Sequence, residues 1–102
     1  MPTVTFRDET PTGRLLSERT ATGLPDRMTV GGLIALRIRE EASHADTPAD
    51  IAHRTAAAEQ AFTTNGFFIL AGDHQLDDLD TVVDLMKDPT LVFIKLMPLA
   101  GG

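Results

Sequence analysis

The sequence predicts an α+β domain, because strand-like segments occupy both ends of the chain and helix-like segments occupy its middle. Near the N-terminus, apolar and polar residues alternate over residues 4–7, the period of a strand with one buried face. After Thr29, apolar residues recur every three to four positions, the period of an amphipathic helix. Later in the chain, short apolar runs at 67–70 and 90–96 are bounded by glycine or proline, which is typical of buried strands.

The first strand is predicted to belong to a hairpin. Residues 10–13 read Thr-Pro-Thr-Gly, in which the proline fixes φ and the glycine tolerates positive φ. Residues 14–22 then form the returning strand, although their apolar alternation is poor.

The first helix is predicted to begin after Thr29, whose side chain can cap it. Met28 and Leu33 flank this cap at the positions of a hydrophobic staple. Gly31 and Gly32 in the first turn each cost about 1 kcal/mol relative to alanine. We therefore expect another part of the chain to approach the helix backbone there.

A second helix is predicted over about 47–65. Thr47 is its N-cap, Pro48 fills the first helical position, and Asp50 supplies negative charge at the positive end of the helix dipole. Asn65-Gly66 ends it with a left-handed residue. Beyond the strand at 67–70, residues 75–76 are predicted as a short strand. Residues 80–84 are predicted as a single helical turn capped by Asp80 or Thr81.

Composition narrows the classes of protein. At 102 residues and 42% apolar, the chain has the size of one globular domain, and no run approaches the roughly 20 apolar residues of a membrane span. The net charge of −6 argues against sequence-independent nucleic-acid binding. There is no cysteine, and the histidines and aspartates lack metal-ligand spacing, so we expect no bound metal or cofactor and no enzyme activity. The first residues do not resemble a secretion signal, which favours a cytoplasmic protein.

Five segments in the second part of the chain and at its end occur in the order and spacing of ubiquitin. Residues 67–72 resemble its third strand, and Gln75-Leu76-Asp77-Asp78 resemble the residues after that strand. Thr81-Val82-Val83-Asp84 resemble its capped turn. Residues 90–94 resemble its final strand, and Leu99-Ala100-Gly101-Gly102 resemble its tail. The resemblance implies a ubiquitin-like β-grasp fold over residues 1–96, in which a mixed four- to five-stranded sheet packs on a main helix. The helix at 47–65 would be an insertion that extends the main helix or packs beside it, and residues 97–102 would be a flexible di-glycine tail.

The resemblance implies a protein modifier. In that family an E1-like activating enzyme uses ATP to adenylate the terminal carboxylate, here that of Gly102 next to Gly101. An E2-like conjugating enzyme then helps to transfer it to amines of target proteins, and a JAB-type peptidase removes it. Pro98, Leu99 and Ala100 would be read by the activating enzyme. Pro98 and Ala100 stand near the places of the arginines of ubiquitin's tail, which implies a dedicated bacterial activating enzyme.

Two alternatives stay open from the sequence. The ending Pro-Leu-Ala-Gly-Gly is also similar to sulfur carriers that form a C-terminal thiocarboxylate for molybdopterin, thiamine or tRNA thiolation. A non-conjugated β-grasp binding or assembly module is the other. Independently of these alternatives, the exposed edges of the final strand and the added helix are the surfaces expected to support self-association.

The resemblance also implies a docking patch on the sheet. Its residues would be Ile69 with Ile94, or Leu96 if the register is shifted by one, and a slip of one residue would place the same side chains in the core. Lys87 and Lys95, the only lysines of the chain, are the candidate acceptors if copies are joined to one another.

Overall fold

The computed structural model describes residues 1–95 and confirms an α+β fold. Its main element is a mixed five-stranded sheet in the order β2-β1-β7-β4-β5. The two central strands, β1 and β7, run parallel, and the other neighbouring strands run antiparallel. The strands of this sheet are β1 (Val4–Glu9), β2 (Leu15–Ala21), β4 (Phe67–Ala71), β5 (His74–Leu76) and β7 (Thr90–Lys95).

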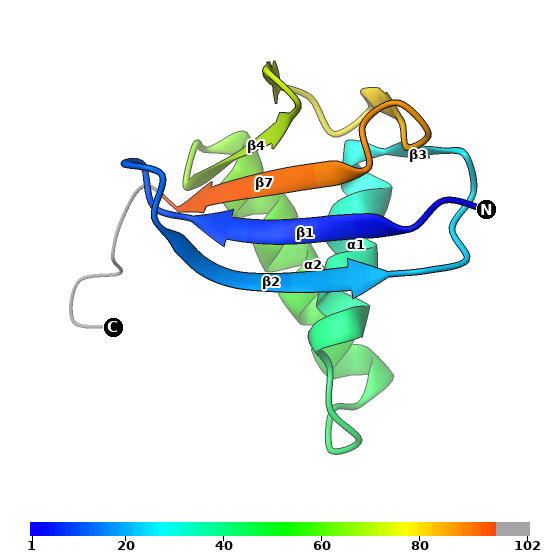
Figure 1. Cartoon of the computed structure of the whole chain (residues 1–102). Helices are drawn as coiled ribbons and strands as arrows, with labels where there is room; N and C mark the ends of the chain where they lie inside the picture. Colours follow the sequence, from blue (N-terminus) through cyan, green and yellow to red (C-terminus); the bar gives the residue numbers. More distant parts are fainter. Residues whose placement is uncertain (96–102) are drawn as a thin grey trace.

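Two helices, α1 (Val30–Glu41) and α2 (Pro48–Thr63), lie side by side on one face of the sheet. Figure 1 shows both of them behind the strands. The core fills the space between the helices and the sheet. Its most deeply buried large side chains come from α1, from three strands of the sheet and from the segment after β6: Val4, Val30, Leu33, Ile34, Ile69, Leu85 and Leu91. The segment predicted as an inserted helix is thus a separate helix packed beside the first one.

The predicted hairpin is present. Strands β1 and β2 pair from Val4 opposite Ala21 onward, with an irregularity between Asp8 and Glu9. The turn closes where the amide of Thr10 donates to the carbonyl of Arg14 at 2.9 Å. Within residues 1–95, β2 is an edge strand of the sheet, and its residues before Ala21 are exposed on both faces, which explains their poor apolar alternation.

Both predicted helix caps are confirmed. The Thr29 hydroxyl accepts a hydrogen bond from the amide of Gly32 at 3.0 Å. Thr47 and Asp50 form a reciprocal capping box, in which each side chain accepts from the other residue's amide. Beyond α2, Asn65 is left-handed with φ of 64°.

The expected close approach at the start of α1 is also present. A Cβ added to Gly31 would lie 3.4 Å from the carbonyl oxygen of Leu79, and that oxygen accepts the Gly31 amide at 2.9 Å. The segment before β6 therefore satisfies one of the free amides that every helix N-terminus leaves, and a glycine makes room for it.

The prediction of a helical turn at 80–84 is wrong. Residues Val82–Asp84 form strand β6, which pairs antiparallel with β3 (Arg27–Thr29) in a second, two-stranded sheet. Two adjacent β-branched valines favour extended backbone. The pairing brings Thr81 to the start of α1, where its carbonyl accepts the Val30 amide at 2.9 Å. The capping pattern of the local sequence is overridden by this contact with a segment about 50 residues earlier.

Candidate functional site

The outer face of the sheet carries a strip of four half-buried apolar side chains. Phe68 and Leu70 lie on β4, and they stand opposite Ile94 and Val92 on β7. Side chains alternate between the two faces of a strand, and the intervening residues of β4 and β7 point into the core: Ile69, Ala71, Leu91 and Phe93. The four outward residues, called here the outer strip, are therefore all on the face that the helices leave open.

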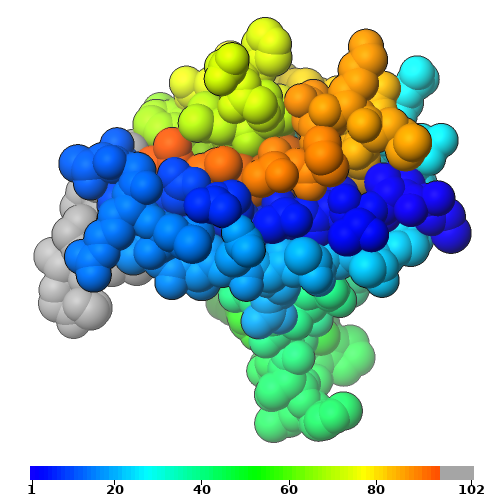
Figure 2. Space-filling model, in the orientation of Figure 1, coloured from blue at the N-terminus to red at the C-terminus, as the bar shows by residue number. Residues whose placement is uncertain are grey.

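Polar side chains border the outer strip on the side of β1. Arg7 lies opposite Val92, and its guanidinium donates to Glu9 at 3.1 Å and to Glu18 of β2 at 2.6 Å. On the other side, Gln75 of β5 stands opposite Leu70. An apolar centre with a polar rim is the usual anatomy of a protein–protein interface. Figure 2 shows this face, with the orange atoms of β7 visible between the blue atoms of β1 and the yellow-green atoms of residues 67–76.

The predicted docking patch is therefore corrected at one position. Ile69 is only 1% exposed and belongs to the core, whereas Ile94 is half-buried on the outer face as predicted. The alternative, Leu96, lies outside the described residues. Residues 67–70 are all apolar, so their sequence has no alternation that would reveal which side of the strand faces the helices. Sequence reasoning consequently missed Phe68, Leu70 and Val92.

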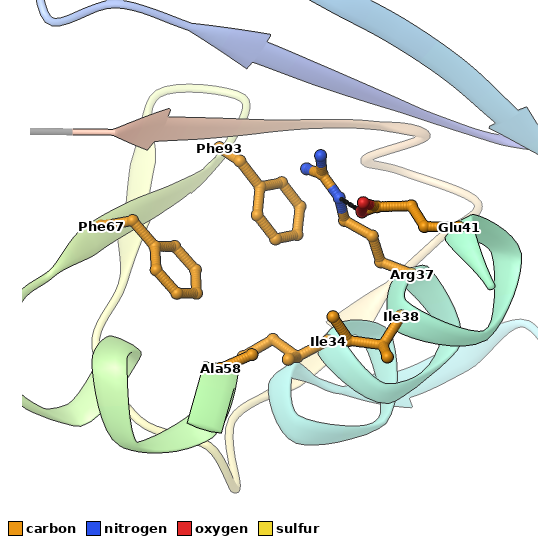
Figure 3. Close-up of a pocket in the computed structure, with 7 residues that line it drawn as sticks. All are labelled: Ile34, Arg37, Ile38, Glu41, Ala58, Phe67 and Phe93. Atoms are coloured by element: carbon orange, nitrogen blue, oxygen red, sulfur yellow. Dashed lines mark hydrogen bonds and ion pairs between the residues drawn. The ribbon is translucent and has the colours of Figure 1, made fainter. Parts of the chain in front are cut away.

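A second feature lies on the opposite face of the sheet, where the two helices, β4 and β7 line a partly open pocket of about 200 Å³. Figure 3 shows the rings of Phe67 and Phe93 on one side of it and α1 and α2 on the other. The two rings stack at 5.8 Å between centroids, with an angle of 17° between their planes. The remaining lining residues come from the two helices: Ile34, Arg37, Ile38, Glu41 and Ala58.

Arg37 forms the polar edge of this pocket. Its guanidinium donates hydrogen bonds to both carboxylate oxygens of Asp8 on β1, and it donates from Nε to Glu41 at 2.7 Å. It also stacks over the Phe93 ring at 4.5 Å. Burial disfavours the charged guanidinium, but the hydrogen bonds that it donates to Asp8 and Glu41 outweigh this effect, so the pKa of Arg37 lies above its ordinary value.

Asp8 is the buried carboxylate of this arrangement, at 5% exposure, and it also accepts from the Ser17 hydroxyl at 2.9 Å. Removing one partner of a buried ion pair leaves the other charge buried and unpaired, which is strongly destabilising. Asp8 and Arg37 thus tie α1 to the centre of the sheet. The sequence gives no sign of this pair because its members are 29 residues apart.

The structure describes the other predicted residues only in part. Lys87 is exposed in the turn after β6, which suits an acceptor amine. Lys95 is the last residue of β7 and stands opposite Phe67. The tail residues Pro98, Leu99, Ala100, Gly101 and Gly102 lie outside the described residues.

Within residues 1–95, no three histidine, cysteine or acidic side chains gather where they could hold a metal ion. In the same range, no helix is long and apolar enough to cross a membrane.

Comparison of the sequence with protein-family models and with curated proteins finds no match.

Proposed function

We propose that this chain is a ubiquitin-like modifier of the β-grasp class, whose Gly102 carboxylate is activated by a dedicated E1-like enzyme and joined to amines of target proteins. The observation that carries the proposal is the di-glycine at 101–102 placed after a central strand of a mixed sheet. The parallel pairing of β1 with β7, the antiparallel strands outside them and helices on one face support the β-grasp.

The chemistry follows from the low reactivity of a carboxylate. In the first step an oxygen of Gly102 attacks the α-phosphate of ATP, pyrophosphate leaves, and an acyl-adenylate forms. An enzyme thiolate then attacks the carbonyl carbon and AMP leaves. Finally, a target amine displaces the thiolate and loses a proton, which leaves an amide bond. Two residues without a Cβ allow the chain to enter a narrow active site. The chain acts here as a substrate and supplies no catalytic side chain.

The outer strip supports the same proposal, because a carried protein needs a surface that its enzymes recognise. It is apolar at its centre, includes two residues of β7, the strand that precedes the tail in the sequence, and is bordered by the Arg7, Glu9 and Glu18 network. We assign it to the docking of the activating and conjugating enzymes.

A sulfur carrier is the second candidate, and the observation that favours it is Pro98, three residues before Gly101. It shares the adenylation step, after which sulfur replaces one carboxylate oxygen.

The first test is adenylation itself. An E1-like enzyme co-expressed with the chain from its genomic neighbourhood, which the proposal requires, should exchange labelled pyrophosphate into ATP only when the chain is present, and deletion of Gly102 should abolish the exchange. Exchange that persists without Gly102, or no exchange with the intact chain, would contradict both candidates and leave a binding or assembly module.

A further inference from the structure

A shallow groove of about 490 Å³ runs between α1 and α2. Within residues 1–95, its lining comes from these two helices alone, so it lies on the side of the helix layer that faces away from the sheet. Its floor is formed by small and apolar side chains: Ala35, Ile51, Ala52 and Ala56. Ala52 and Ala56 are exposed, and their short side chains leave the groove open to close approach by another protein surface.

A charged side chain stands at each end of the groove. The two helices run antiparallel, and residues 42–47 join the end of α1 to the start of α2. Arg39 lies in the last turn of α1, at the end of the groove near this connection. Glu59 lies at the other end, where its Oε1 is 3.7 Å from the position of a Cβ added to Gly31. Residues 31 and 39 are about 12 Å apart along the axis of α1.

These two charges have no counterpart in the part of the chain that the structure describes. Among residues 1–95, neither the guanidinium of Arg39 nor the carboxylate of Glu59 takes part in a hydrogen bond or an ion pair. The neighbouring arginines of the same helices, Arg37 and Arg54, are both paired. The groove therefore has an apolar floor, a positive charge at one end and a negative charge at the other.

We propose that this groove is the contact surface between two copies of the chain. Consider a two-fold axis in the plane of the helix layer, at right angles to the line from Arg39 to Glu59 and through its midpoint. This axis exchanges the positions of the two residues, so that in a pair packed face to face Arg39 of each copy meets Glu59 of the other. The surface is thus complementary to itself, which is what an isologous interface requires. The alanines between the two charges let the helices of the two copies pack closely.

The size of this face indicates weak association. Helices of 12 and 16 residues are about 18 and 24 Å long, and side by side they are about 20 Å wide. Their outer face measures about 400 Å² in plan, which is small beside the roughly 800 Å² per partner of a standard interface. The net charge of −6 on each copy also opposes association. We therefore expect a dimer that forms reversibly at high protein concentration.

Dimerisation through the helix layer leaves the outer strip free, because the strip lies on the other face of the sheet. The dimer itself does not depend on the proposed function. If that function holds, each dimer presents two outer strips, and an enzyme with two docking sites binds it more tightly than it binds one copy.

The test is sedimentation equilibrium of the purified full-length chain over a wide range of concentrations. Arg39→Glu and Glu59→Arg should each weaken self-association at least about tenfold, since each turns both ion pairs into like-charge contacts. The two variants mixed in equal amounts should associate as tightly as the wild-type chain, because opposite charges again meet at both ends of a mixed pair. Arg14→Glu makes the same change of charge in the exposed hairpin loop and is the matched control, which should leave association unchanged.

A wild-type chain that stays monomeric at the highest concentration would overturn the proposal. So would a dimer that survives both reversals, or a mixture that does not associate although both variants melt at the wild-type temperature. Glu59→Gln removes the charge without placing a cation beside the start of α1, and it should weaken association even if Glu59→Arg lowers Tm. Unchanged association with Glu59→Gln would also count against the groove. Adenylation of Gly102 is measured separately, so these results are independent of the proposed function.

Discussion

Ile69 and Ile94 provide the sharpest test of the assigned faces of the sheet, because they are the same residue type on adjacent strands with opposite orientations. Ile69 is 1% exposed in the core, and Ile94 is half-buried in the outer strip. Replacing a buried isoleucine with alanine removes three carbons and leaves a cavity, which costs about 2–5 kcal/mol. At Ile94 part of the side chain is already in water and solvent fills the space, so we expect a cost of about 1 kcal/mol.

These energies correspond to clearly different melting temperatures. For a domain of this size, each kcal/mol lowers Tm by roughly 4–8 °C. Because the same factor applies to both variants of one domain, Ile69→Ala should lower Tm by at least about twice as much as Ile94→Ala. The assay is calorimetry together with urea unfolding, with both variants prepared alongside the wild-type chain. Equal losses at the two positions, or a larger loss at Ile94, would refute the assignment of faces.

Three further predictions follow from the ion pair, the α2 cap and the outer strip. Arg37→Met should lower the free energy of unfolding by about 3–5 kcal/mol, because it removes the guanidinium from buried Asp8. In urea unfolding, the double variant with Asp8→Asn should recover much of that loss. A loss in the double variant equal to the sum of the two single losses would contradict the pairing. Hydrogen bonds from the amide and hydroxyl of Thr47 lower the pKa of Asp50. The stabilisation that Asp50 gives to α2 is therefore present above the ordinary aspartate pKa and is lost as pH falls through the lowered pKa. An NMR titration should place the midpoint of Asp50 below that of a model aspartate, and Thr47→Ala should raise this midpoint. Leu70→Ser and Val92→Ser should weaken binding to the activating enzyme at least tenfold in titration calorimetry, whereas Thr20→Ala on exposed β2 should leave it unchanged.

Local chemistry predicted the elements whose signals lie within a few residues. Thr47, Pro48 and Asp50 define the start of α2 because a capping box is closed by neighbours in sequence. Thr29 defines the start of α1 for the same reason.

The remaining features depend on contacts between distant segments. Strand β6 is extended because it pairs with β3, and this contact overrides the capping pattern at Asp80 and Thr81. The orientation of β4 depends on which side meets the helices, and four consecutive apolar residues do not reveal it. The Asp8–Arg37 pair and the pocket beside it form only when β1 and α1 come together.

The most direct test of the modifier function is mass spectrometry of proteins from cells that express this chain with its genomic neighbours, beside a control that lacks Gly102. Trypsin cleaves after Lys95, so a conjugated target should carry residues 96–102 as a branch on a lysine or on its N-terminal amine. We expect this branch with the intact chain and not with the control. A free chain in which sulfur replaces one terminal oxygen would instead identify a sulfur carrier, and an unmodified Gly102 in the absence of any branched peptide would contradict the account.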